Sequence, residues 1–384
     1  MDTRKFTFSE NGILTIHEGV RKIPTNSFKK REDITGVILP KSLITIGKHA
    51  FCSCINLLSV ETNSKLKVIE QGAFQNCFKL ITFEIPSTVH TIGRSVFNCC
   101  YCLKTPIVIP RKVKVLSDSI FFNCKSIPSV VLPAKLQKIG ALTFFGCSNV
   151  SSFMIPLSVT SIEDFAFCNC TKIREIILPH DLEKIGKSAF SSCTNLQKIT
   201  LPPKVDLIEK SCFSHCDKLE EVVVSGPIWK IRSSAFTGCK MLKLIILPEG
   251  LVKISRYAFS WCISLRQITF PLSLLQISEY AFSNCRNLEN ANFPEDNVCE
   301  RHERSFYECK NLCLSKRFTE KLFGDLTQIE KRFADEHCAI SGDEFYEKMS
   351  IILLKCGHFF KRDSLLEWIK IRNICPFCKE KIGF

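Results

Sequence analysis

The hydrophobic positions of the chain repeat with a period of 23 residues over most of its length. Phenylalanine marks the repeat from Phe28 to Phe306, and only the steps that end at Phe121 and Phe306 are one residue longer. From Phe51 on, a cysteine follows each phenylalanine by three residues; an isoleucine or leucine precedes each phenylalanine up to Phe282 by five residues, and an aliphatic residue follows it by six. Because no single coil can bury these residues alone, ladders kept in register over 13 coils predict a solenoid whose neighbouring coils share one core.

Each coil is expected to contain a short strand and a tight corner. Residues 196–202 read Leu-x-x-Ile-x-Leu-Pro, which is typical of a short strand stopped by proline. Adjacent strands would lie about 4.8 Å apart along the stack. The segment Lys187–Cys193, with small Ala189 beside Phe190, is predicted as a single helical turn. The predicted fold is therefore mostly β with short helical turns.

The ladders resemble the BspA-type leucine-rich repeat family, whose unit runs roughly L-x-x-I-x-I-P-x-x-V-x-x-I-G-x-x-A-F-x-x-C. Residues 158–170 follow this unit closely, and the resemblance covers residues from about 20 to 312. It implies a curved right-handed solenoid with a strand-lined concave face. Many members are surface proteins, from which this chain departs because it has no export signal.

These patterns divide the chain into four parts. We expect an N-terminal cap over residues 1–20, the leucine-rich repeat solenoid over 21–314, a helical linker or cap over 315–336 and a small zinc-binding domain over 337–384. The repeat degrades at 294–305, where Arg301 takes an isoleucine position, as a solenoid's last coil requires. Apolar residues at helical spacing between charges predict the helix of the linker.

Positions just after the aliphatic residue that starts each strand should face outward, and their chemistry varies from coil to coil. Such variation on a constant frame suits a protein-recognition surface. The alternative is variation that a solvated face merely tolerates. The candidate substrate-binding residues are Arg174, Glu175, Lys198, Glu220, Glu221, Lys243, Arg266 and Gln267. A second strip, one residue before the isoleucine ladder, is expected to serve solubility: Lys22, Lys138, Lys184, Lys230 and Lys253.

Charge and cysteine content restrict the function classes. The net charge of +14 is diffuse and contains no lysine or arginine run typical of nucleic-acid binding. The ladder cysteines are interpreted as small buried hydrophobes; a metal site around Cys99, Cys100 and Cys102 is the alternative. With no apolar signal segment, no stretch long enough to span a membrane and 23 cysteines, the chain is expected in the cytoplasm, with the nucleus possible, and not secreted.

Four ligand-type residues near the C-terminus have the spacing of a metal site. Cys356 and His358 are one residue apart, and 16 residues later Cys375 and Cys378 form a C-x-x-C pair. Three thiolates and one imidazole complete a tetrahedral Zn²⁺ site and leave no position for a substrate water. We therefore predict a structural zinc ion. The alternative is four residues that share this spacing by chance.

The last 47 residues resemble the RING finger of ubiquitin ligases. The resemblance maps Cys356, His358, Cys375 and Cys378 onto the third, fourth, seventh and eighth ligands, which hold the second zinc of a RING. Of the first site only Cys338 remains, because the other three ligand positions carry Ser341, Lys361 and Ser364. The expectation is a degenerate, small α+β RING-like domain with one zinc.

The resemblance also implies a partner. Ile340, Trp368 and Pro376 match the contacts to a ubiquitin-conjugating enzyme, and Lys379 matches the basic linchpin position that bridges to ubiquitin. No residue needs to act as a nucleophile, since such ligases work by positioning. The chain is thus predicted to be an E3 ubiquitin-protein ligase whose solenoid binds substrate. The alternatives are a non-enzymatic adaptor with a structural zinc finger and, third, a SUMO ligase.

Overall fold

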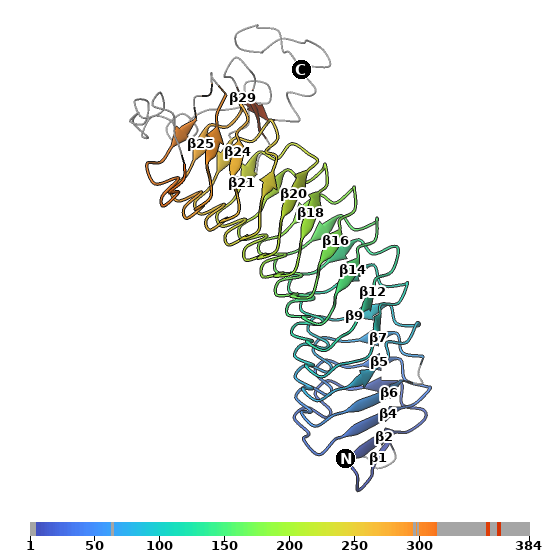
Figure 1. Cartoon of the computed structure of the whole chain (residues 1–384). Coiled ribbons are helices and arrows are strands. Elements are labelled where there is room, and N and C mark those ends of the chain that lie inside the picture. The colour runs from blue at the N-terminus through green and yellow to red at the C-terminus, as the bar shows by residue number, and fades with distance from the viewer. Residues whose placement is uncertain are drawn as a thin grey trace, which may run out of the picture.

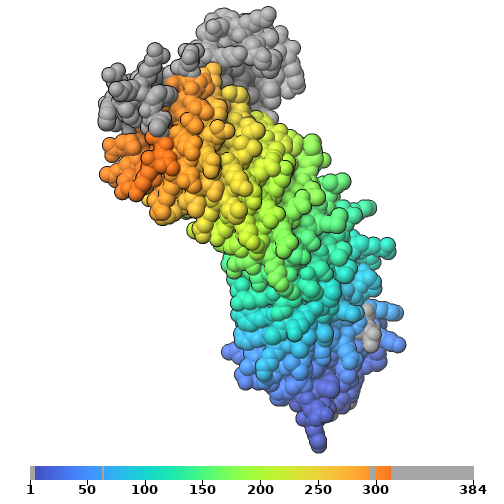
Figure 2. Space-filling model, viewed as in Figure 1, coloured from blue at the N-terminus to red at the C-terminus, as the bar shows by residue number. Residues whose placement is uncertain are grey.

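The computed structural model describes residues 5–62, 65–294, 297 and 299–312, together with the backbone of residues 351–353 and 359–361. The coils stack into a long curved rod that advances from the N-terminal coil to the coil of Phe306 (Figure 1, Figure 2). Within the described residues the coils consist of short strands and tight turns, without a helix. The predicted solenoid is confirmed.

One column of parallel strands runs along the solenoid, with one strand from each coil. Alternate residues of these strands point into the core and outward, as the pleat of a strand requires. The strands of this first column are β2 (Ile13–Ile16), β4 (Gly36–Leu39), β6 (Ser59–Thr62), β8 (Thr82–Phe83), β10 (Ile107–Val108), β12 (Val130–Val131), β14 (Ser152–Met154), β16 (Glu175–Ile177), β18 (Lys198–Leu201), β20 (Glu221–Val224), β22 (Leu244–Ile245), β24 (Gln267–Thr269) and β26 (Asn290–Asn292).

A second column is made of two-residue strands, each ending on the isoleucine ladder or on the residue that replaces it. Each pairs in parallel with its counterpart in the next coil, except where the column is interrupted. Its strands are β3 (Lys22–Ile23), β5 (Thr45–Ile46), β7 (Val68–Ile69), β9 (Thr91–Ile92), β11 (Val115–Leu116), β13 (Lys138–Ile139), β15 (Ser161–Ile162), β17 (Lys184–Ile185), β19 (Leu207–Ile208), β21 (Lys230–Ile231), β23 (Lys253–Ile254), β25 (Gln276–Ile277) and β27 (Glu300–Arg301).

The lengthened coil that ends at Phe121 interrupts both columns. Pairing stops there between β8 and β10 and between β9 and β11. The first column is also unpaired between β12 and β14 and between β22 and β24, and the second between β17 and β19. The other lengthened coil, ending at Phe306, keeps its pairing: β27 lies in register with β25, so that Arg301 is opposite Ile277. The Arg301 guanidinium lies 4.2 Å from the centroid of the Phe293 ring, which covers the charge that replaces an aliphatic side chain.

The corner that contains each ladder phenylalanine differs from the predicted helical turn. In the segment Lys187–Cys193, Ser188 and Ser192 have φ angles of 52° and 59°, whereas a right-handed helix needs negative φ at every residue. The backbone N–H groups of Ser188, Phe190 and Ser192 donate to carbonyl oxygens of the next coil at 2.7–2.9 Å instead of to their own turn. The corner is therefore a pair of tight turns that joins adjacent coils by hydrogen bonds.

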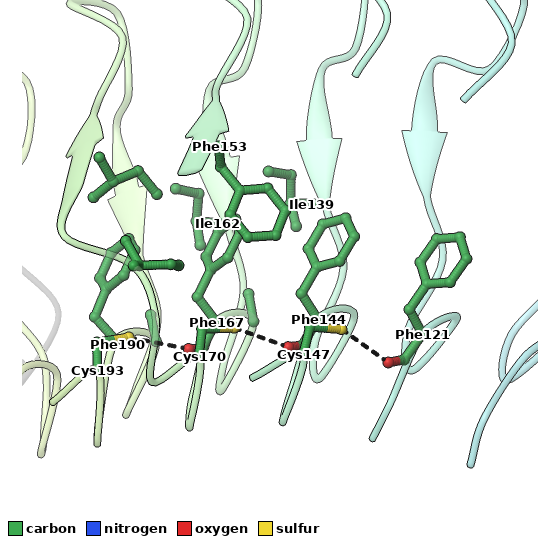
Figure 3. Close-up of a cluster of buried hydrophobic side chains, with 14 of the residues drawn as sticks. Phe121, Ile139, Phe144, Cys147, Phe153, Ile162, Phe167, Cys170, Phe190 and Cys193 are labelled. Carbon is green, nitrogen blue, oxygen red and sulfur yellow. Dashed lines mark hydrogen bonds between the residues drawn. The ribbon is translucent and has the colours of Figure 1, made fainter. Parts of the chain in front are cut away.

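The core is a continuous stack of phenylalanine rings. From Phe28 to Phe306, successive ladder rings lie nearly parallel, with centroids 5.0–5.8 Å apart. Figure 3 shows part of the stack, from Phe121 to Phe190. At the N-terminal end, β1 (Phe6–Phe8) pairs antiparallel with β2, and Phe6 packs edge-on against Phe28 at 5.6 Å. The first coil is thus covered by a hairpin.

The ladder cysteines have a specific role beside the rings. Each thiol donates to the carbonyl oxygen of the ladder phenylalanine in the preceding coil, at 3.0–3.3 Å, and Figure 3 shows three of these bonds as dashed lines. Cys193 and Cys170, for example, donate to Phe167 and Phe144. A cysteine therefore supplies a small apolar side chain and satisfies a buried carbonyl at the same time.

Candidate functional site

The exposed side of the first strand column is the candidate recognition face. Strands β14 to β22 form one five-stranded parallel sheet, and their inward residues, Phe153, Ile176, Ile199, Val222 and Ile245, are all buried. The outward residues of the same strands consequently lie in two lines that run along the solenoid axis. Most of the residues predicted to bind substrate lie on or beside one of these lines.

The predicted charged residues pair with one another across neighbouring coils. Glu175, Lys198 and Glu221 lie side by side in register on β16, β18 and β20. Lys198 Nζ lies 2.9 Å from Glu221 Oε2, and Lys243 Nζ lies 2.7 Å from Glu220 Oε2. Pairs this exposed contribute little stability, so their value lies in the alternating charge pattern they present.

Three other predicted residues extend this face. Arg174 and Arg266 precede β16 and β24, and Gln267 begins β24; all three are exposed. Within the described residues, neither arginine forms an ion pair with a carboxylate. These two cations therefore remain available for an acidic partner.

The second outward line is largely apolar, with exposed Thr200 and half-buried Val223 between Ile177 and Ile246, and the sequence prediction did not identify it. We call it the apolar column: its side chains come from five coils, and between 56% and 88% of each is exposed. The signal was present, because the period-two alternation of each strand places one more outward residue after the charged one. Exposed apolar residues gathered in this way form a candidate interaction site. Its members are Val108, Val131, Met154, Ile177 and Ile246.

Three lysines of the strip along the second column, Lys22, Lys138 and Lys184, form ion pairs. Lys138 and Lys184 lie on either side of Glu163, with Nζ to carboxylate oxygen distances of 2.8 and 2.6 Å. Partial burial opposes ionisation of Glu163, but hydrogen bonds from both lysines and from Ser161 outweigh it and lower the pKa of this carboxyl to about 2. Lys22 pairs with Glu70 at 3.2 Å. Besides adding charge, these lysines link one coil to another through their ion pairs.

The cysteines of the solenoid are poor candidates for chemistry. Burial raises the pKa of the ladder thiols from Cys54 to Cys285, to about 12 at Cys54, so these stay protonated and unreactive, whereas a hydrogen bond with Cys285 lowers the pKa of Cys309. At the alternative cluster, Cys100 is buried and donates to the carbonyl oxygen of Phe74 at 3.3 Å, so it is not turned toward Cys99 and Cys102 as a shared ligand. Among the described residues, no three His, Cys, Asp or Glu side chains are grouped as a metal site would require.

The predicted zinc ligands and conjugating-enzyme contacts lie outside the described residues. This applies to Cys356, His358, Cys375 and Cys378, to Ile340, Trp368, Pro376 and Lys379, and to the predicted linker 315–336. Two described strands lie within this part of the sequence: β28 (Ile351–Leu353) pairs antiparallel with β29 (Phe359–Lys361). Leu353 is opposite Phe359, so the pairing brings together the two ends of the segment that carries Cys356 and His358.

Models of known protein families match both the repeat region and the C-terminal part of the chain. The model described as "BspA type Leucine rich repeat region (6 copies)" matches residues 4–128, 114–243 and 229–352. The model described as "Ring finger domain" matches residues 336–379. The stacked coils and the two family matches thus define a leucine-rich repeat protein with a C-terminal RING finger. The chain belongs to the BspA-type leucine-rich repeat family.

Solved structures agree with this fold. A leucine-rich repeat protein from Bacteroides ovatus is 23% identical with a TM-score of 0.63, over 82% of this chain and 94% of that one. A leucine rich cell surface protein from Faecalibacterium prausnitzii is 26% identical with a TM-score of 0.52, over 77% and 95%. Both likenesses describe the solenoid.

The curated relatives match the RING finger end of the chain. The E3 ubiquitin-protein ligase MBR1 of Arabidopsis thaliana is 43% identical over 44 residues, which are 12% of this chain and 6% of that protein. RING finger protein 122 of Mus musculus is 30% identical over 77 residues, 19% of this chain and 48% of that protein. The chain therefore spans less than half of these relatives. Within the described residues, no helix is long and apolar enough to cross a membrane.

Proposed function

We propose that this protein is an E3 ubiquitin-protein ligase in which the solenoid binds a protein substrate and the RING finger binds a ubiquitin-conjugating enzyme. The observation that carries the proposal is the match of residues 336–379 to the RING finger, together with the likeness of this segment to named E3 ligases. Attached to a repeat array with a varied outer face, such a finger would bring the charged enzyme close to a bound target.

The donor set of the finger fits one structural zinc ion. Cys356, Cys375 and Cys378 would supply thiolates and His358 an imidazole, which is a complete tetrahedral set for Zn²⁺. The metal would supply folding energy to this small domain and no catalytic water. At the first RING site only Cys338 offers a soft ligand, so we expect one ion per chain.

The finger would act by positioning. Ile340, Trp368 and Pro376 would form the apolar contact with the conjugating enzyme, in which a tryptophan is a typical hot spot. Lys379 would take the linchpin position, where a lysine lacks the planar fork of an arginine and should bridge more weakly to ubiquitin. The attacking lysine comes from the substrate, so the ligase gains rate by holding the thioester-linked ubiquitin near it.

The substrate would bind along the sheet face of the solenoid. Arg174 and Arg266 offer cations there, the paired Lys198–Glu221 and Lys243–Glu220 offer a fixed charge pattern, and the apolar column runs beside them. Met154→Glu places a charge in the middle of the apolar column and should abolish substrate capture. Because Met154 is 88% exposed, the same change should leave the stability of the solenoid unaltered.

An adaptor without ligase activity is the second candidate. Three of the four ligands of the first zinc site are replaced, by Ser341, Lys361 and Ser364, and this loss favours a finger that only binds other proteins. SUMO transfer is the third, since a single zinc is also found in SUMO-ligase fingers. In either ligase role, we place the protein in the cytoplasm, with the nucleus as the alternative.

The deciding experiment is autoubiquitylation of the full chain with a panel of conjugating enzymes and, separately, with the SUMO-conjugating enzyme. We expect ubiquitin transfer that is lost in Trp368→Ala while zinc content stays at about one ion per chain. Trp229→Ala, which changes a solenoid tryptophan, is the matched control and should retain activity. Failure of every conjugating enzyme to support transfer would establish the adaptor, and transfer of SUMO alone would establish the third candidate.

A further inference from the structure

A hollow lies on the turn side of the last coils, at the corners that contain the ladder phenylalanines, and it is not part of the candidate recognition face. Its volume is about 400 Å³, and four aromatic side chains line it: Tyr257, Trp261, Tyr280 and Tyr307. Trp261 and Tyr307 are 45% and 51% exposed, which is unusual for residues so large. The hollow is therefore a surface site that spans the coils of Phe236 to Phe306.

The aromatic walls occupy backbone positions that do not favour large residues. Tyr257, Tyr280 and Trp261 have φ angles of 59°, 57° and 62°, two residues before or after a ladder phenylalanine. Three preceding coils in a row carry serine at the position of the tyrosines (Ser188, Ser211 and Ser234). The same positions are left-handed in the other coils, for example at Ser188 and Ser192, so these aromatic residues differ from their counterparts in side chain and not in backbone.

The floor and lining of the hollow are rich in hydrogen-bond donors and contain no carboxylate. Ser260 and Ser283 are buried at its base, with their hydroxyl oxygens 2.8 Å apart. Ser234, Thr237 and Asn284 complete the lining, and the hydroxyl oxygen of Tyr280 accepts a hydrogen bond from Arg304 Nη1 at 3.1 Å. A ligand that combines flat apolar groups with unpaired carbonyl oxygens would satisfy these groups.

The rim is cationic. Arg256 lies 5.0 and 5.6 Å from the ring centroids of Tyr257 and Tyr280, and Arg286 lies 5.2 Å from that of Trp261. Glu279 neutralises part of this charge, since it pairs with Arg256 at 3.0 Å. Among the described residues, Arg286 forms no ion pair with a carboxylate. The rim therefore favours acidic groups beside the apolar ones.

The repeat of the solenoid fits the repeat of one extended peptide conformation. Tyr257, Tyr280 and Tyr307 come from three successive coils, with neighbouring ring centroids 5.3 and 5.8 Å apart, so the outer two rings are at most about 11 Å apart. A polyproline II helix has three residues per turn and repeats every ~9.3 Å, with all its backbone carbonyls unpaired. Prolines three residues apart would therefore meet aromatic rings two coils apart. Aromatic grooves are a general means of binding such segments.

We infer that this hollow binds a proline-rich segment of polyproline II conformation, with prolines at every third residue and acidic residues beside them. The inference rests on the proposed function, because it names the class of segment that a substrate would present. The sheet face and this turn-side hollow lie on different parts of each coil, so a substrate could engage either or both.

Binding is tested on the full chain by fluorescence anisotropy with a labelled peptide, Glu-Pro-Ala-Ala-Pro-Ala-Ala-Pro-Glu. The comparison peptide has the same composition with the three prolines adjacent. We expect about tenfold tighter binding of the first peptide, and a loss of about tenfold or more in Tyr257→Ser and in Tyr307→Ser. Phe165→Ser is the matched control, since Phe165 is also an exposed aromatic residue at a left-handed position (φ 59°) but does not line the hollow.

The melting temperature of each variant shows whether a loss of peptide binding comes from a loss of folding. Tyr257→Ser installs the residue that five other coils carry at this position, but it also removes the contact of Tyr257 with the Tyr280 ring at 5.3 Å, so its melting temperature should fall only slightly. Equal affinity for both peptides, unchanged binding in Tyr257→Ser, or binding of neutral oligosaccharides in place of the peptide would each overturn the inference. The assay contains no ubiquitin or conjugating enzyme, so its failure would leave the ligase proposal unaffected, and failure of autoubiquitylation would leave peptide binding unaffected.

Discussion

Removal of one ring from the middle of the phenylalanine stack should divide the solenoid into two less cooperative halves. Phe190 is fully buried and stacks on Phe167 at 5.4 Å and on Phe213 at 5.6 Å, almost parallel to both. Replacing a buried phenylalanine with alanine costs about 3–5 kcal/mol, and two lost ring contacts place Phe190→Ala at the upper end of this range. Because each coil contacts only its neighbours, the loss also weakens the coupling between the coils on either side.

Denaturant unfolding followed by circular dichroism measures both effects. We expect Phe190→Ala to lower the midpoint and to broaden or split the transition, since the two halves would unfold at different denaturant concentrations. The matched control is Phe306→Ala, where the ring is only half-buried and stacks on a single ladder ring, Phe282, at 5.1 Å. Its cost should be about 1–2 kcal/mol with a single transition. Equal losses in both variants, or an unbroken transition in Phe190→Ala, would refute the nearest-neighbour argument.

Two further predictions concern an ion-pair cluster and the metal. The pKa of Glu163 is lowered from 4.5 to about 2, so the charged carboxylate stabilises the folded chain above about pH 4.5, and this contribution is lost as the pH falls towards 2. Both lysine partners are about half exposed, so we expect Glu163→Gln to cost about 1–2 kcal/mol at neutral pH and much less near pH 2. Urea titrations at the two pH values measure this difference, and an equal cost at both would contradict the prediction. Cys375→Ser should remove zinc and the folded finger while the solenoid keeps its unfolding midpoint, measured by metal analysis and circular dichroism, and retention of zinc would exclude this residue as a ligand.

The solenoid could be predicted from the sequence because every coil contributes four core residues at fixed spacing. The phenylalanine, cysteine and two aliphatic ladders are each set by burial, and burial leaves few side chains of suitable size and polarity. The shape of the corner could not be predicted in the same way. Serine and asparagine at positions such as Ser192 and Asn169 tolerate both helical and left-handed backbone, and the choice between them depends on hydrogen bonds to the next coil, which a local pattern does not contain.

The candidate recognition face was predicted in part. Charged outward residues such as Lys198 and Glu221 are visible in the sequence, but their ion pair depends on the register between β18 and β20. The apolar column was missed because valine, isoleucine and methionine in a strand usually indicate a buried side chain, and only the alternation with Phe153 or Ile176 shows that Met154 and Ile177 must point outward. The predicted zinc and conjugating-enzyme residues lie outside the described part of the chain and stay predictions.

Ladder positions are constrained by the core, whereas outward and corner positions are not, and this difference determines which residues can vary to recognise a ligand. A change at a ladder position disturbs two neighbouring coils at once, so these positions conserve size and polarity along the stack. The outward lines of the sheet and the left-handed corner positions contact few core atoms, and a change there alters the surface of one coil alone. The tyrosines at 257 and 280 stand where five other coils carry serine, and the frame accommodates both. Recognition by this solenoid therefore depends on lines of side chains that share a position in successive coils, and a ligand that matches the coil repeat can contact several of them at once.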